Sequence, residues 1–373
     1  MKNKTLIIAA VSATGYAQAA ANLGFDVITF DAFADADTSL IAKITFKLNL
    51  IEHSIDIDDF KQQFLTLNHE DFVGFLYGSL FDNAPDLLAW IASKMPVLGN
   101  TPQVLKSVKG LEFFQLLQSM NILHPEIKQL SDDEIQVLAH PEQWLVKRLS
   151  GTGGLHVKVA TCKDNRGDYL QKKIEGMPIS LLFVADGKHA QAVGVNQQFV
   201  SPTKDLPYRF AGAVGHIEVA EKIKLYLTDV AEQLTTALGL RGCNSLDGVF
   251  DGERVWILEL NPRLSATFSL YPNLMHAHLQ GCAGELVELP QNDGSLAQLI
   301  LYANQSLQLP VNFTWPEYVM NVPEADKSAS YISVLQDEPV CTVLAASETA
   351  IAAKQLVYEK ALTLEKRLLE VNG

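Results

Sequence analysis

The first hundred residues alternate short apolar runs with amphipathic segments. The apolar runs have the length of buried strands and lie at 5–11, 26–33, 72–78 and 96–100. An amphipathic helix ending near Gly24 separates the first two runs, and another at 85–94 precedes the last. Strands that alternate with helices in this way predict a parallel, doubly wound α/β sheet.

The N-terminus admits a second interpretation. Two lysines, an apolar run and Ala17-Gln18-Ala19 imitate a secretory signal peptide. We favour a buried first strand, because the β-α-β pattern continues through the supposed cleavage site. The four cysteines are far apart and form no CxxC, which is typical of reduced thiols. We therefore expect a cytoplasmic protein, and no apolar run reaches the ~20 residues of a membrane span.

The pattern changes at Thr101. Two helices are expected over 101–122, with Thr101 as the N-cap and Pro102 at the first helical position. Strands, two hairpins and one long helix follow, at 142–149, 156–160, 168–174, 180–200, 218–239 and 244–263. This is an α+β pattern, and short strands with a charged terminal helix complete the chain. We expect domains at 1–100, 101–290 and 291–373.

The net charge and the first glycine turn indicate whether the chain binds nucleic acid or NAD. A net charge of -14 and a pI near 5.1 argue against nucleic acid as the main partner. Asp31 ends the second expected strand, where a dinucleotide-binding fold places its ribose-binding acid. The preceding turn has one glycine, Gly15, where that fingerprint needs three. An NAD-dependent oxidoreductase is therefore the weaker of the enzyme hypotheses.

A glycine-rich segment, SGTGG at 150–154, lies between two expected strands. A P-loop would lead into a helix, so this segment is instead the tip of a hairpin whose backbone N–H groups can close over phosphates. Lys147, on the strand beneath, can reach the same oxygens. The alternative is an ordinary glycine-rich turn beside a surface lysine.

A second polar group ends the hairpin at 244–263. Glu259 and Asn261 alternate on one strand and share a face, which leaves Leu258 and Leu260 to face the core. Asp247 joins that face if the connecting loop has an odd number of residues. Two carboxylates and an amide oxygen suit Mg²⁺, or Mn²⁺ in its place. The alternative is a set of exposed acids paired with nearby arginines.

In their order along the chain, Lys147, the glycine segment, QKKIEG and ELNPR resemble the ATP-grasp superfamily of carboxylate–amine ligases. The resemblance implies an ATP-grasp fold with a Rossmann-like pre-ATP-grasp domain, a two-lobed nucleotide clamp and a small C-terminal domain. It also implies ATP and Mg²⁺ as cofactors, small-molecule substrates, no membrane partner, and a homodimer as in many relatives.

The resemblance also assigns roles to residues. Lys109, with Lys106 as its nearby alternative, and Lys147 would contact phosphates, and Arg263 would steady the acyl-phosphate or its carboxylate. Catalysis would rest on Arg263 and Lys147. The flap would consist of Ser150, Gly151, Thr152, Gly153 and Gly154. The adenine hinge would be Gln171, Lys172 and Ile174, with Glu175 as a substitute ribose contact. The metal ligands would be Asp247, Glu259 and Asn261.

A narrower resemblance concerns the substrates. FDAFADADT, VKRLSGTGGLHV and LELNPRLSAT are similar to an ATP-grasp group of methylotrophic bacteria linked to methanopterin- and methanofuran-type cofactors, and to tyramine–glutamate ligases. This implies L-glutamate as the acid and a tyramine- or tyrosine-like amine, or a cofactor precursor, as the acceptor. Specificity would come from loops at 77–83 and 201–214, where Lys204 and Arg209 are candidates for a carboxylate. An ATP-binding regulatory protein without ligase activity is the non-enzymatic alternative.

Overall fold

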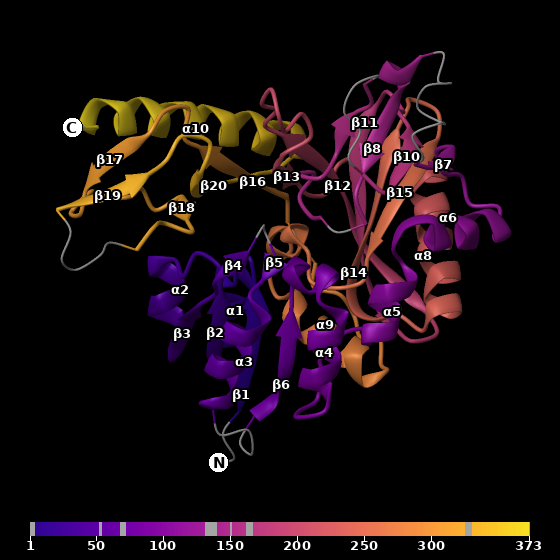
Figure 1. The fold of residues 1–373 in the computed structure, drawn as a ribbon, viewed down its shortest axis with the longest axis horizontal. Helices are drawn as coiled ribbons and strands as arrows, with labels where there is room; N and C mark the ends of the chain where they lie inside the picture. Colours follow the sequence, from indigo (N-terminus) through magenta and orange to yellow (C-terminus); the bar gives the residue numbers. More distant parts are fainter. Residues whose placement is uncertain are drawn as a thin grey trace.

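A computed structural model gives the architecture of residues 4–51, 54–67, 72–130, 140–149, 151–161, 167–291, 293–324 and 330–372. An N-terminal α/β unit occupies one side of the molecule, and a long sheet with a smaller sheet beside it occupies the other (Figure 1). Ser150, one of the expected flap residues, lies outside the described residues. Within those ranges, no helix combines the length and apolarity needed to cross a membrane.

The N-terminal unit confirms the parallel sheet. Its strand order is β3-β2-β1-β6, with bounds Ile44–Lys47, Asp26–Asp31, Thr5–Ala10 and Phe72–Tyr77. Every residue of β1 is buried, as expected for a central parallel strand covered on both faces. β3 was not among the expected strands, and the run at 96–100 contributes only a bridge between Phe75 and Val97.

Helices and short elements complete this unit. The helices are α1 (Thr14–Asn22), α2 (Ala36–Ile41), α3 (Ile57–Leu65) and α4 (Pro85–Ala92), and the short elements are β4 (Leu50–Ile51), β5 (Ser54–Ile55) and the 3-10 turn η2 (Ser79–Asn83). Phenylalanines from β2, α3, β6 and η2 pack together beneath the sheet. This core fixes η2 at the carboxyl end of β6, facing the rest of the chain.

The smaller sheet follows two helices, as expected. α5 (Pro102–Ser107) is capped by Thr101, whose hydroxyl accepts from the Val104 N–H, and α6 spans Gly110–Ser119. The antiparallel sheet has the order β7-β10-β8-β9, with bounds Ile127–Gln129, Tyr169–Lys172, Trp144–Lys147 and Lys158–Val159. Because β9 has only two residues, most of 148–157 forms a long loop rather than a tight turn.

The large sheet contains both expected hairpins. Its order is β15-β14-β11-β12-β13-β16-β20-β18, with bounds Val255–Asn261, Arg241–Phe250, Met177–Asp186, Ala190–Val200, Phe210–Val214, Ser295–Tyr302, Pro339–Ser347 and Val319–Met320. Gly187 and Gly252 take φ values of 98° and 102° in the two turns, a region that favours glycine. α8 (Glu221–Leu238) packs on β11 and β12 and ends at Gly239 in the left-handed conformation.

The C-terminal part extends the same sheet. β16 pairs with β13, and α10 (Ala350–Val371) lies across β16 and β20 (Figure 1). Phe199 and Val214 share one core with Leu299 and Val343, so the packing is continuous across the region near residue 290. The remaining elements are η3 (Pro141–Gln143), η4 (Ala266–Leu270), α9 (Leu274–Ala283), β17 (Leu307–Pro310) and β19 (Tyr331–Val334). The expected domain boundary near 290 stays a prediction.

Candidate functional site

A β-bulge brings the acids of the second hairpin together. Four residues connect β14 to β15, and with this even number Asp247 would pair with Leu258. The register shifts after Asp247, so that Asp247 pairs with Glu259 instead. Directly opposed residues of antiparallel strands place their side chains on one face. Asp247 thus joins the face of Glu259 through the bulge, although the connecting loop is even. The expected core position of Leu258 was wrong, because Leu258 is only partly buried at the bulge and lines the pocket.

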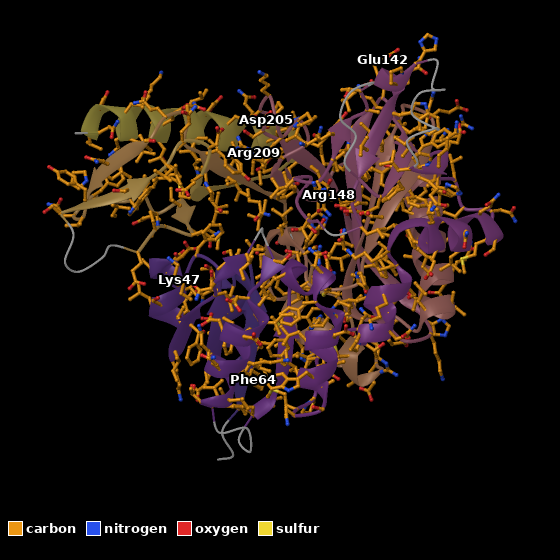
Figure 2. All side chains as sticks on the ribbon, in the orientation of Figure 1. Lys47, Phe64, Glu142, Arg148, Asp205 and Arg209 are labelled. Atoms are coloured by element: carbon orange, nitrogen blue, oxygen red, sulfur yellow. The ribbon has the colours of Figure 1, made fainter. Side chains whose placement is uncertain are left out.

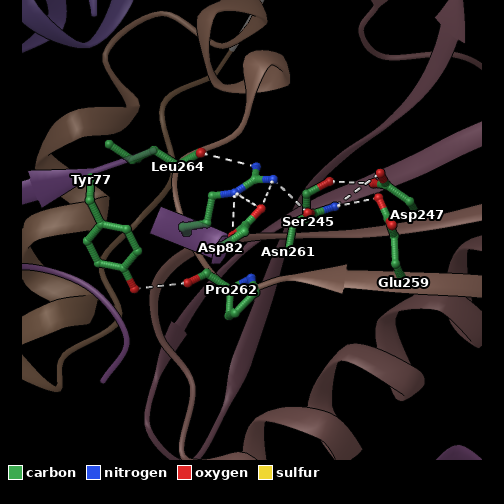
Figure 3. Close-up of polar contacts among 9 residues, drawn as sticks. Tyr77, Asp82, Ser245, Asp247, Glu259, Asn261, Pro262 and Leu264 are labelled. Atoms are coloured by element: carbon green, nitrogen blue, oxygen red, sulfur yellow. Dashed lines mark hydrogen bonds and ion pairs between the residues drawn. The ribbon is translucent and has the colours of Figure 1, made fainter. Parts of the chain in front are cut away.

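Asp247 and Glu259 share one amide. Asn261 Nδ2 donates to Asp247 Oδ2 at 3.1 Å and to Glu259 Oε1 at 3.2 Å, and the Ser245 hydroxyl donates to Asp247 Oδ1 at 2.8 Å (Figure 3). Burial and the neighbouring Glu259 raise the pKa of Asp247. Burial alone would raise the pKa of Glu259 too, but Lys147, His156 and Lys109 lower it below its usual value. Two half-buried carboxylates this close are a suitable place for a divalent cation.

Arg263 is held by a residue that the sequence analysis did not assign. Its Nη2 lies 2.8 Å from Asp82 Oδ2, and both side chains are buried, at 9% and 3% exposure. The same nitrogen donates to Asn261 Oδ1 at 2.7 Å, so the Asn261 amide turns its nitrogen, not its oxygen, toward the carboxylates (Figure 3). Arg263 thus links η2 of the N-terminal unit to the acid pair. The Asp82 carboxylate therefore already compensates the positive charge of Arg263, which was expected to contact the substrate.

The two expected phosphate-contacting lysines flank the acid pair. Lys147 ends β8 with only 6% exposure, and burial lowers its pKa while Glu259 and Asp247 oppose that shift. Lys109 caps α6 and lines a pocket with Glu259 and Asn261. The alternative, Lys106, instead forms an exposed ion pair with Asp86. The geometry therefore favours Lys109 over Lys106.

This pocket lies between the two sheets. The empty space at this pocket, open solvent included, is about 420 Å³. Residues from α6, the loop after β8, β10 and β15 line it, among them Lys109, Phe113, Arg148, Tyr169 and Glu259. Arg148 lies centrally, where the N-terminal unit meets both sheets (Figure 2).

The described residues of the glycine segment, 151–154, dock on the chain at 208–210 beside the pocket. Gly153 and Gly154 take φ values of 62° and 74°, and the Gly153 carbonyl accepts from the Phe210 N–H at 2.9 Å. A Cβ on Gly154 would lie 1.9 Å from the Tyr208 carbonyl oxygen, so only glycine permits this contact. Gly151 lines the pocket itself, and the Thr152 carbonyl accepts from the Leu155 N–H in the turn.

The expected adenine hinge contains a buried amide without a partner. Gln171 is completely buried on β10, and among the described residues neither its oxygen nor its side-chain nitrogen has a hydrogen-bond partner. Gln171 and Tyr169 alternate with Leu170, which packs in the small sheet's own core, so Gln171 shares the face of the pocket-lining Tyr169. An amide that can both donate and accept suits the edge of a base.

Other groups of the expected adenine hinge already have hydrogen-bond partners within the protein. The N–H groups of Lys172 and Lys173 donate to the carbonyls of Glu126 and Gln143, so neither N–H is free for a ligand. The Lys172 ammonium bonds Gln143 Oε1. Glu175 is exposed and pairs with Lys173 at 2.6 Å, so the structure gives it no ribose-facing position.

Three other candidates lie outside the pocket lining. Arg209 donates to backbone carbonyls of Ser201 and Asp337 and stacks on Tyr302, so it braces a loop, and Lys204 is exposed. Asp31 is fully buried and accepts from the N–H groups of Ala13, Phe33 and Ala34. An acid with this many internal donors has no position for a dinucleotide ribose, which removes the basis of the oxidoreductase hypothesis.

Several residues of the site were not assigned from the sequence, and three of them matter for its chemistry. His156 and Tyr169 line the pocket, and Asp82 anchors Arg263. Tyr169 precedes Gln171 by two positions and shares its face, which period-2 alternation could have indicated. Asp82 lies in the 77–83 loop that was expected to set specificity. Within the described ranges no group of three or more His, Cys, Asp or Glu could hold a metal, so any metal site here rests on the acid pair.

Comparisons with known proteins bear on the fold that carries this site. The family model of the ATP-grasp domain matches residues 110–267. The chain is similar to the solved biotin carboxylase of Campylobacter jejuni in its βγ-ATP complex, at 14% identity and TM-score 0.70 over 95% of this chain and 89% of that one. No curated protein sequence matches the chain.

Two further structures share the fold. The biotin carboxylase domain of the Hydrogenobacter thermophilus 2-oxoglutarate carboxylase, solved with MgADP and bicarbonate, has 11% identity and TM-score 0.72 over 95% of this chain and 89% of that one. The N5-carboxyaminoimidazole ribonucleotide synthetase of Thermus thermophilus has 14% identity and TM-score 0.68 over 97% of this chain and 98% of that one. The chain therefore has the ATP-grasp fold.

Proposed function

We propose that this chain is an ATP- and Mg²⁺-dependent, ADP-forming ligase that joins a carboxylate to an amine through an acyl-phosphate. One observation carries the proposal: Glu259 lines one pocket with Lys109 and Gly151, and the charge of Lys147 acts on both Glu259 and its half-buried neighbour Asp247. Acids for a cation and amines for phosphates in one pocket are what phosphoryl transfer requires. The nucleotide-bound structures of similar fold support the same ligand.

The residues divide the nucleotide between two ends of the pocket. Gln171, with an unpartnered buried amide, is proposed to meet the adenine, and the Ile174 N–H lies in the same hinge. Lys109, Lys147 and the flap N–H groups are proposed to hold the phosphates. Asp247 and Glu259 would hold Mg²⁺, which when bound neutralises the phosphate oxygens and orients the transferring group. Asn261 would join them through its oxygen only if its amide turned away from Arg263.

The chemical steps follow from these positions. The carboxylate substrate attacks the γ-phosphorus in line, a new O–P bond forms, and ADP leaves with the electrons of the broken P–O bond. The lysines and flap amides stabilise the charge on the transferring group. An amine then attacks the acyl carbon, releases phosphate and gives up a proton. The docked flap excludes water, which would otherwise hydrolyse the acyl-phosphate.

Arg263 acts differently from the role first expected of it. Its guanidinium already bonds Asp82 and Asn261, so we propose that it positions the Asn261 amide over the acid pair. A direct contact with the substrate carboxylate would need Asp82 to move. The narrower sequence resemblance favours L-glutamate as the acid and a tyramine- or tyrosine-like amine, or a pterin or furan cofactor precursor, as the acceptor.

Nucleotide product analysis tests the proposal. The protein is incubated with Mg²⁺-ATP, L-glutamate and a panel of amines that includes tyramine and tyrosine. We expect ADP and phosphate to form only with a matching acid–amine pair, and Lys147→Ala to abolish turnover while the chain stays folded. AMP with pyrophosphate would contradict the acyl-phosphate step. ATP binding without any product would favour a regulatory protein instead.

A further inference from the structure

His156 lies in the flap loop and faces the pocket. It lines the pocket together with Lys109, Arg148 and Glu259, which come from three other places in the chain. Its ring packs directly on the flap: a Cβ on Gly151 would lie 2.3 Å from His156 Cγ. The glycine at 151 is therefore what allows an imidazole to occupy this position.

The imidazole has unused hydrogen-bonding capacity. His156 Nδ1 is buried and has no hydrogen-bond partner among the described residues. Burial lowers the pKa of His156 to about 4, with Lys147, Lys109 and Arg148 acting in the same direction and Glu259 opposing. The ring is therefore neutral at physiological pH, with one N–H donor and one acceptor nitrogen. A buried polar atom left unpaired in a pocket indicates a ligand that pairs with it.

The docked flap holds this ring in place. Phe210 and Tyr208 contact the two glycines that precede His156, and the Val157 N–H donates to the Gly154 carbonyl. His156 lines the pocket beside Glu259 and Lys109, and the charges of both act on it. The imidazole thus faces the region proposed for the terminal phosphate.

We propose that His156 donates a hydrogen bond to the γ-phosphate of ATP and so distinguishes the triphosphate from ADP. This inference rests on the proposed function. A neutral donor adds to the lysines without adding a further positive charge, and it is available only while the flap is docked. Loss of the γ-phosphate removes the acceptor of the His156 hydrogen bond. Loss of this hydrogen bond would favour opening of the flap once ADP has formed.

Binding of two nucleotides tests the inference. Titration calorimetry would measure the affinities for Mg²⁺-AMP-PNP and Mg²⁺-ADP in the wild type, His156→Ala and His156→Asn. The control is His276→Asn, an exposed histidine on α9. A hydrogen bond to a charged acceptor corresponds to roughly a 10- to 100-fold change in affinity. We expect His156→Ala to lose about that much for AMP-PNP with little change for ADP, and His156→Asn, which keeps an N–H donor, to recover part of the loss.

Each other result has one meaning. Equal losses for both nucleotides would show that His156 only shapes the flap, and unchanged affinity for both would show no contact; either overturns the inference while the proposed function stands. Failure of the wild type to bind either nucleotide would overturn both. Melting temperatures of the three variants close to that of the wild type exclude misfolding as the cause of a loss.

Discussion

The buried ion pair between Asp82 and Arg263 gives the sharpest prediction about stability. Replacing Asp82 with Asn keeps the shape and one acceptor oxygen but removes the compensating charge. Arg263 would then be an unpaired cation at 9% exposure, 2.8 Å from a neutral amide. Breaking one partner of a buried pair typically costs about 3–5 kcal/mol. Because Asn retains an acceptor, we expect Asp82→Asn to lose about 3 kcal/mol of unfolding free energy, at the lower end of that range.

The chain offers a matched control nearby. Asp86 and Lys106 also form an ion pair, at 2.7 Å, but these side chains are 87% and 50% exposed. Exposed pairs contribute about 0–1 kcal/mol, so Asp86→Asn should change little. Urea unfolding at about 25 °C and neutral pH, followed by tryptophan fluorescence, measures both variants against the wild type. The same substitution at nearly the same pair distance isolates the effect of burial.

A double variant separates charge from packing. Asp82→Leu with Arg263→Met replaces the pair by apolar side chains, and we expect it to be more stable than Asp82→Asn because no buried charge is left uncompensated. A loss below about 1 kcal/mol for Asp82→Asn, equal to that for Asp86→Asn, would refute the reasoning. It would mean that water or movement of η2 compensates Arg263.

Three further predictions follow from single groups. Burial, then the carboxylates of Asp31 and Asp37, raise the pKa of Asp35 to about 8, so the native state binds the Asp35 proton more tightly than the unfolded chain does. Stability should therefore fall as pH rises from about 4 to about 8. Asp35→Asn should remove that fall in melting temperatures measured across this range, and an unchanged slope would contradict the prediction. Gln171→Leu should stabilise the ligand-free chain against urea by roughly 1 kcal/mol, since an unpaired buried amide is removed, while weakening ATP binding in calorimetry; a destabilised variant would show that the amide has a partner. Gly154→Ala should raise the KM for ATP at least roughly 10-fold because its Cβ meets a backbone oxygen. Gly153→Ala shares the strain of a positive φ but has no described atom within 4 Å of its Cβ, so it should raise the KM less; equal effects would exclude the contact with Tyr208 as their cause.

Local features of the chain were readable from its sequence. The parallel strands, the two glycine hairpin turns and the Thr101 cap depend on neighbouring residues, and the structure confirms them. The ATP-grasp fold was predicted by resemblance, from the order of short motifs. Lys109 and Glu259 line one pocket, and Lys147 and Asp247 interact with Glu259, because each motif lies at the end of an element whose position the fold determines.

Features that depend on strand register or on contacts between distant residues could not be predicted from the sequence. The bulge at Leu258 changes which residue faces Asp247, and no pattern of apolar residues specifies it. The contact between Asp82 and Arg263 joins positions 181 residues apart. The pairing of β13 with β16 likewise depends on tertiary packing. His156 was missed because one histidine in a loop carries no periodic signal.

The most direct test of the account is whether a Mg²⁺-dependent nucleotide site exists at the acid pair. Calorimetric titration of AMP-PNP, with and without Mg²⁺, would compare the wild type with Glu259→Gln and with Glu253→Gln, an exposed acid in the β14–β15 turn. The account predicts saturable binding that strengthens with Mg²⁺ in the wild type and in Glu253→Gln, and loss of that strengthening in Glu259→Gln. Binding that is equal in all three proteins, or independent of Mg²⁺, would contradict it.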